Sequence, residues 1–234
     1  MNAALWYICF FLCFTLIYFF LQIIRTVCFV VLLRFNAWFL FQDSTINYIC
    51  ENLLEVCSAV TDSSDETRLK FKDEQTFLHA ELSEQLLHKL CEKKLLDDLV
   101  MTLFNCESTR LKQVRFRDAS KLSVKGLKTL RGHRIQELEA VGLSKATVTD
   151  LISCLGEWSL LNLRNFNVAN STFVDSNKFC VVVALAKLRN LQALNVSRTE
   201  FNRTSLELVV EDLPKLESLN ISCTQEQHRH NIKL

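Results

Sequence analysis

The chain has 234 residues, and its 27 lysines and arginines balance 26 aspartates and glutamates to a formal net charge of +1. This balance gives no bulk electrostatic reason to expect a nucleic-acid ligand. Hydrophobic residues make up 49% of the chain, whereas four glycines and one proline are too few for collagen-like, proline-rich or glycine-loop-rich proteins. The composition therefore predicts one or two domains with a sizeable core.

Residues 1–42 differ in composition from the rest of the chain. Their only two charged side chains are Arg25 and Arg34. Residues 3–24 form an apolar run long enough to cross a bilayer as one helix, and a cleaved signal peptide fits poorly because no basic stretch precedes the run. Both arginines follow the run, so the positive-inside rule leaves the remainder in the cytosol. The alternative is a gene-model artefact, and the protein is then cytoplasmic or nuclear.

Residues 43–105 have a helical pattern without repeats. We expect helices over residues 46–57, 74–90 and 92–104, with a polar loop at residues 61–66. Asp43, Ser44 and Thr45 precede the first helix and are favoured at helix N-caps. The second helix carries leucines at four-residue steps, namely Leu78, Leu82, Leu86 and Leu90.

A six-residue pattern recurs in residues 106–224. Its five copies begin at residues 111, 135, 163, 191 and 216, which are 24, 28, 28 and 25 residues apart. The L-x-x-L-x-L spacing and this period are typical of leucine-rich repeats. The predicted fold is therefore an α/β leucine-rich-repeat solenoid, preceded by the helical region and an apolar N-terminal helix and followed by a polar tail at residues 225–234. The clearest repeat-core residues are Leu163, Phe166, Val168, Leu191, Leu194, Val196, Leu216, Leu219 and Ile221.

Polar residues recur at fixed places in the pattern. A residue between two inward positions, such as Asn195 or Asn220, is expected to face the concave side of the sheet. Ser171, Thr199 and Thr224 follow their strands at the position where small polar side chains satisfy backbone groups at a turn.

Two motifs precede the repeats. Thr45-Ile46-x-x-x-Cys50-x-x-x-Leu54 resembles the elongin-binding box of von Hippel–Lindau-box proteins, in which a helix docks into a groove and a small cysteine enters a tight pocket. The second motif resembles the cullin-2 box, with a histidine where that box has proline. Its residues are Leu78, His79, Leu82 and Leu86.

This order of boxes and repeats, over residues 44–224, resembles the zyg-eleven and zer-one family of substrate receptors of cullin-2 ubiquitin ligases. The resemblance implies a non-catalytic adaptor that binds elongin C with elongin B, cullin-2 and protein substrates. The family's C-terminal armadillo-like domain, which binds degrons, has no counterpart in this sequence.

The alternative function is a membrane-anchored leucine-rich-repeat interaction module. An enzyme is not expected, because the sequence contains no G-x-S-x-G, H-E-x-x-H or P-loop motif. The seven cysteines after residue 42 form no C-x-x-C pair, which predicts reduced thiols, no metal site and no cofactor.

Overall fold

The computed structural model describes residues 42–61, 66–172, 178–201 and 203–224. The chain divides into two compact units, Met1–Asn47 and Tyr48–Leu234, and the labelled helices and strands below belong to the second unit. The apolar run at residues 3–24 and the polar tail at residues 225–234 lie outside the described residues. Among the helices that are described, none is long and apolar enough to cross a membrane.

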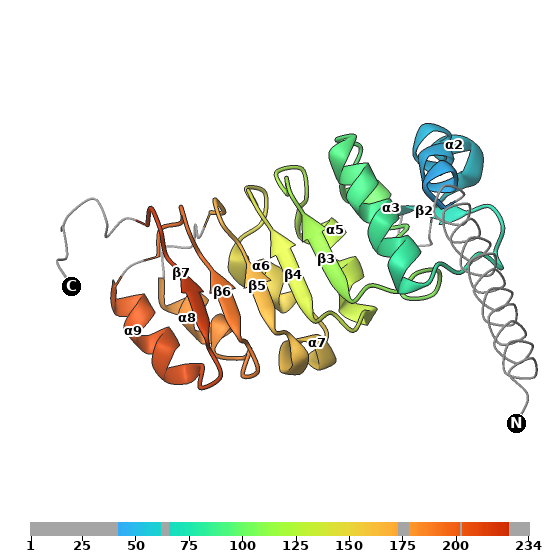
Figure 1. Ribbon diagram of the computed structural model, residues 1–234. Coiled ribbons are helices and arrows are strands. Elements are labelled where there is room, and N and C mark those ends of the chain that lie inside the picture. Colours follow the sequence, from blue (N-terminus) through green and yellow to red (C-terminus); the bar gives the residue numbers. More distant parts are fainter. Residues whose placement is uncertain (1–41, 62–65, 173–177, 202, 225–234) are drawn as a thin grey trace, which may run out of the picture. The chain divides into compact units, whose positions relative to one another are not determined.

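Five parallel strands form the main sheet and follow one another in chain order (Figure 1). They are β3 (Gln113–Phe116), β4 (Glu137–Ala140), β5 (Asn165–Asn167), β6 (Ala193–Asn195) and β7 (Ser218–Asn220). Their register places equivalent motif residues side by side, in the order Val114, Leu138, Phe166, Leu194 and Leu219. The strands expected within residues 163–168, 191–196 and 216–221 are therefore adjacent and parallel.

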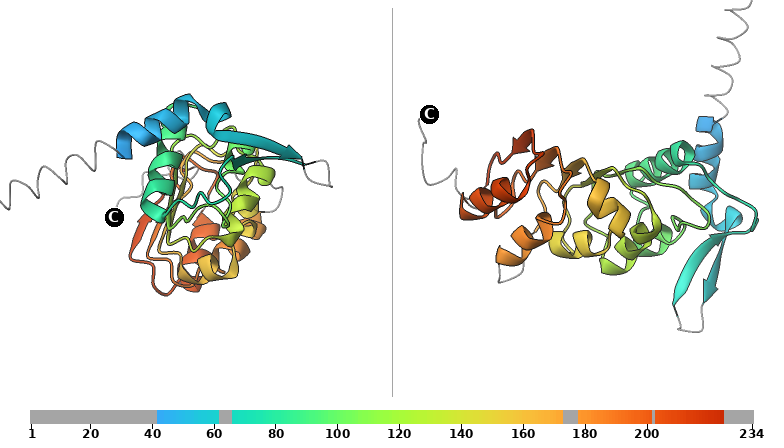
Figure 2. Two further views of the ribbon diagram at one scale, coloured as in Figure 1. Left: turned by 90° about the vertical axis from the view of Figure 1, so that its right-hand side faces the viewer. Right: turned by 90° about the horizontal axis from the view of Figure 1, so that it is seen from below.

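The connections between these strands pack on one face of the sheet and leave the other face open (Figure 2). The first connection contains α5 (Val124–Leu127) and a 3₁₀ helix (Lys128–Gly132), and the second contains α6 (Val148–Ser153) and α7 (Glu157–Asn162). The third and fourth contain α8 (Lys178–Leu185) and α9 (Arg203–Asp212). Large side chains such as Phe104, Phe116 and Phe166 are fully buried, and each contributes about 1.5–3 kcal/mol by leaving water.

The region before the parallel sheet contains a β-hairpin, which corrects the expectation of an all-helical segment. Residues 42–51 are helical, and after a bend at Asn52 a single turn, α2 (Leu53–Val56), leads into β1 (Cys57–Thr61). This strand pairs antiparallel with β2 (Thr67–Phe71). In β2, buried Leu69 and Phe71 alternate with exposed charged residues. A period of two places buried residues on one face of a strand but not on one face of a helix. The Leu69 N–H donates to the buried Thr102 hydroxyl at 2.7 Å.

The later helices of this region are also shorter than expected. The helix expected over residues 74–90 is α3 (Ala80–Glu92), and the one expected over residues 92–104 is reduced to α4 (Asp98–Met101). Lys94 has a φ of 56°, a left-handed conformation that ends α3. The Asp97 side chain then caps α4 by accepting the Val100 N–H.

The predicted fold class, a leucine-rich-repeat solenoid after a helical region, is wrong for the described residues, and the apolar helix expected before it lies outside them. The described chain is a mixed α/β structure with a small antiparallel sheet and a five-stranded parallel sheet. Its connections are not equivalent units, since one has a 3₁₀ helix, one has two helices and two have a single longer helix. Similar strands thus recur at unequal spacing, while the segments between them differ.

Candidate functional site

The open face of the parallel sheet contains a groove of ≈ 360 Å³ that crosses all five strands. Outward-pointing side chains line it, because alternate residues of a strand face opposite sides of the sheet. The polar lining residues are Arg115, Glu137, Glu139, Asn165, Asn167, Asn195, Ser218 and Asn220. We call this surface the sheet groove.

Strand register arranges the outward side chains in two rows. One row runs Gln113, Glu137, Asn165, Ala193 and Ser218, from β3 to β7. The other row runs Arg115, Glu139, Asn167, Asn195 and Asn220. Neighbouring members of a row lie about 4.8 Å apart in the direction of the strand hydrogen bonds, so each row crosses the sheet with polar side chains at every position except Ala193.

The three asparagines of the second row form the same local hydrogen bond between side chain and backbone. Each Oδ1 accepts the backbone N–H two residues later, at 3.1 Å for Asn167, 3.0 Å for Asn195 and 3.0 Å for Asn220. The residue three positions after each of them has a φ of 54–57°. Asparagine suits this place because its short side chain supports the turn at the strand end. With Oδ1 used inward, each Nδ2 is left as a donor toward the groove.

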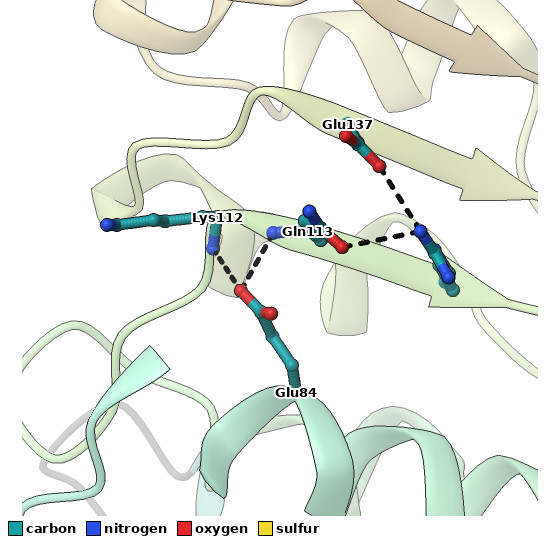
Figure 3. A network of polar contacts seen from close by, with 5 residues as sticks. Glu84, Lys112, Gln113 and Glu137 are labelled. Atoms are coloured by element: carbon teal, nitrogen blue, oxygen red, sulfur yellow. Dashed lines mark hydrogen bonds and ion pairs between the residues drawn. The ribbon is translucent and has the colours of Figure 1, made fainter. Parts of the chain in front are cut away.

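The charged residues of the groove are paired unequally. The Arg115 guanidinium lies 3.3 Å from Glu137 Oε2 and 3.3 Å from Gln113 Oε1 (Figure 3). Glu139 is half-buried, and among the described residues it has no hydrogen-bond or ion-pair partner. The arginine therefore neutralises one of the two carboxylates and leaves the other available to a ligand.

The edge of the sheet at β3 is covered by α3. Glu84 Oε1 accepts the backbone N–H groups of Lys112 and Gln113, both at 2.8 Å (Figure 3). A bare edge strand would leave such donors exposed to other chains. Sequence analysis missed this role of Glu84, because the contact joins residues 28 and 29 positions apart.

The four elongin-box residues do not share one accessible face. Ile46 and Cys50 are buried, with 4% of Cys50 exposed, whereas Thr45 is exposed and Leu54 is 80% exposed. Burial raises the pKa of the Cys50 thiol, which lies near Lys93 and Lys89 at the end of α3. The bend at Asn52 separates Cys50 from Leu54, so the expected four-residue stack does not form.

The cullin-box residues lie at the start of α3. Leu78 is extended and forms a bridge to Thr109, and His79 is the exposed N-cap. Leu82 is half-buried, whereas Leu86 is only 1% exposed and contributes to the core. The helix thus begins partly exposed, at His79 and Leu82, and packs Leu86 inward.

The repeat-core residues of β5 and β6 are buried, but Leu216, Leu219 and Ile221 near β7 are half-buried. Of the predicted small polar residues, Ser171 and Thr199 have side chains that bond to backbone groups. The Ser171 hydroxyl donates to Ala140 O at 3.0 Å and accepts the Leu143 N–H at 3.1 Å, and the Thr199 hydroxyl donates to Val196 O.

The described residues offer little for metal or nucleophile chemistry. No group of three or more histidine, cysteine, aspartate or glutamate side chains in this part of the chain could hold a metal ion. Burial raises the pKa of the Cys91 thiol to about 11, so it stays protonated near neutral pH.

Neither a family model nor a solved structure matches this chain. The sheet groove is therefore the feature on which a function can be argued. Its asparagines carry a recognisable sequence signal, since Asn-Val or Asn-Ile is followed by Ala or Ser in the last three strands.

Proposed function

We propose that this chain is a non-catalytic protein-binding module and that the sheet groove holds an extended segment of a protein partner. The observation that carries the proposal is the pair of in-register polar rows across an open sheet face. Amide donors and carboxylates of this kind suit hydrogen bonding to a peptide backbone and its side chains. The described lining contains neither histidine, the most frequent general base of enzymes, nor a cysteine nucleophile.

The test is selection of phage-displayed 12-residue peptides on the full-length chain. Ala193 lies in the middle of the groove with a small side chain, so Ala193→Arg should fill the groove and remove binding of the selected peptides. Leu161→Arg is the matched control, because Leu161 is exposed on α7, on the helical face. Selected peptides that bind Ala193→Arg as well as the parent chain would contradict the proposal.

A more specific version follows from the resemblance to cullin-2 substrate receptors. In it the chain is an adaptor that binds elongin C with elongin B, and cullin-2, while the groove takes the substrate. One observation favours it, since His79 has a φ of −65°, the value that proline adopts, and Leu78 before it is extended, as a residue before proline must be. Ile46 and Cys50 are buried, so elongin docking would require their side chains to become exposed.

Co-purification of the full chain with recombinant elongin B/C and cullin-2 tests this adaptor proposal. Leu54→Asp changes an exposed side chain and should leave folding intact while removing elongin C binding. Val210→Asp on α9 is a control at another exposed apolar residue. If Leu54→Asp retains elongin C, or the parent chain never binds it, the adaptor proposal fails and the groove proposal is unaffected.

A further inference from the structure

We infer that the segment held in the sheet groove carries a basic side chain that pairs with Glu139, while its backbone carbonyls accept from Asn167, Asn195 and Asn220. This inference rests on the proposed peptide-binding function. It names the chemistry of the partner, and it follows from which groups of the groove are already used within the chain.

Glu139 supplies the cation preference. It lies between Arg115 on β3 and Asn167 on β5 in the register of the sheet. The guanidinium of Arg115 is directed to Glu137 and Gln113, which leaves the Glu139 carboxylate half-buried without a cation among the described residues. A half-buried carboxylate gains from a positive partner more than an exposed one does, because it is less screened by water.

The net charge of the groove agrees with this assignment. Its charged lining residues are Arg115, Glu137 and Glu139, one positive and two negative, which sum to −1. Nucleic acid and acidic peptides would be repelled, whereas a peptide with lysine or arginine would be attracted. The same surface therefore selects against the anionic classes of macromolecule.

The asparagine row supplies the backbone contacts. The inward hydrogen bond of each Oδ1 fixes the orientation of the amide, so the side facing the groove is the donor side. Three donors in a row need acceptors, and the carbonyls of an extended chain are acceptors that every peptide sequence provides. Binding through these amides would therefore tolerate many sequences, and selectivity would come from Glu139.

The length of the ligand follows from the strand spacing. From β4, which holds Glu139, to β7, which holds Asn220, there are three intervals of about 4.8 Å, or about 14 Å. A chain that rises about 3.3 Å per residue covers this distance with about four residues. The smallest ligand is thus one basic residue followed or preceded by about four others.

The experiment uses pools of octapeptides that are random except for one fixed position, which is Arg, Ala or Glu. Binding of fluorescein-labelled pools to the full chain is measured by fluorescence anisotropy. The Arg pool should bind about tenfold more tightly than the Glu pool, a preference that Glu139→Gln should abolish while Ala-pool binding is kept. Glu107→Gln is the control, because Glu107 is exposed outside the groove. Asn195→Asp keeps an oxygen for the Ser197 N–H but loses the donor, and it should weaken Ala-pool binding several-fold.

The outcomes separate the two proposals. Binding that Ala193→Arg removes, but that shows no Arg preference or a preference unchanged in Glu139→Gln, would overturn this inference and leave the binding function in place. Asn195→Asp with undiminished binding of the Ala pool would overturn the backbone contacts. No pool binding above the level of Ala193→Arg would overturn both proposals.

Discussion

At β3 the parallel sheet ends against α3, whereas none of the described elements covers its other edge at β7 (Figure 1). Leu86, Leu87 and Leu90 of α3 are buried, and Glu84 satisfies two backbone donors before β3. On β7, Leu219 is half-buried although its register partner Leu194 is buried. The same strand motif therefore has a complete core at one edge and an incomplete one at the other.

The difference between the β3 and β7 edges shows that α3 contributes its buried leucines to the hydrophobic core beside β3. A leucine stripe on a helix before a sheet has the same spacing whether it covers a sheet edge or docks to a partner. Leu86 illustrates this ambiguity, because the cullin-box motif and the covering helix both need an apolar residue there. Burial of Leu86 assigns it to the covering role in this structure.

The largest expected difference between the two edges concerns core truncation. Leu90 is a fully buried residue of α3, so Leu90→Ala should lower the free energy of unfolding by about 2–5 kcal/mol. Leu219→Ala at the open edge removes a side chain that already contacts water and should cost about 1 kcal/mol. Urea unfolding of both full-length variants, followed by circular dichroism, measures the difference. Equal losses would show that the β7 edge is as well packed as the β3 edge.

A smaller effect is expected from the carboxylate that covers the β3 edge. Glu84→Ala leaves the N–H groups of Lys112 and Gln113 to water and should lower the free energy of unfolding by about 1–2 kcal/mol. Amide hydrogen exchange should accelerate at these two residues first. Glu81→Ala, one turn earlier at an exposed position, is the control and should change stability by less than about 0.5 kcal/mol. A similar loss in both variants would mean that Glu84 has no special role.

Acid should loosen the connection between the sheet and the segment before it. His133 is 2% exposed, its Nδ1 accepts the Leu111 N–H at 3.2 Å, and its Nε2 therefore carries the hydrogen and donates to Phe104 O at 2.8 Å. Burial lowers the pKa of His133, and the nearby charge of Arg110 lowers it further. The unfolded chain, with a histidine pKa of about 6.5, then binds more protons than the folded chain below that pH.

The stability that His133 contributes is thus fully present above about pH 6.5 and falls as the pH drops below it, by at most about 1.4 kcal/mol per pH unit. Urea midpoints between pH 7.5 and pH 5.5 measure this slope. His133→Gln should be less stable at pH 7.5 and should lose the part of the slope due to His133. An unchanged slope in that variant would assign the acid sensitivity to other groups.

The strands of the parallel sheet could be predicted because their signal is local. Six residues in the L-x-x-L-x-L pattern specify the inward positions, and the outward position of Asn195 and the turn contact of Ser171 follow from the same short pattern. The hairpin could have been found from the alternation around Leu69 and Phe71, but five residues are a weak signal beside a polar loop. The helix break at Asn52 could not be predicted, because no proline or glycine lies near it in the sequence.

The candidate site was predicted less completely because its chemistry depends on register. Asn195 and Asn220 follow from the strand pattern, but which carboxylate Arg115 pairs with is decided across two strands. The choice leaves Glu139 without a partner among the described residues. The spacing of residues in the sequence does not predict whether Arg115 pairs with Glu137 or with Glu139.

The smallest expected effect concerns the residue that begins the covering helix. His79 has a φ of −65° and occupies the N-cap position of α3 without a side-chain capping bond, and among the described residues nothing accepts its N–H. Proline therefore fits the backbone there, and Leu78 before it is already held extended by its bonds to Ser108 and Arg110. His79→Pro should raise the free energy of unfolding by about 0.5 kcal/mol, mainly by restricting the unfolded chain. The edge contact of the His79 ring with Phe77, at 5.6 Å between centroids, is lost and reduces the gain.

Gln85→Pro provides the contrast within the same helix. Position 85 lies in the second turn of α3, where proline removes a helical hydrogen bond and clashes with the preceding turn, at a cost of about 3 kcal/mol or more. Because α3 covers the β3 edge, this substitution should also accelerate exchange of the amides that Glu84 protects, whereas His79→Pro should slow it or leave it unchanged. Thermal unfolding and hydrogen exchange of the two full-length variants provide the readout. Destabilisation by His79→Pro would show that residue 79 is not preset for the cullin-box proline, and the observation that favours the adaptor proposal would then be lost.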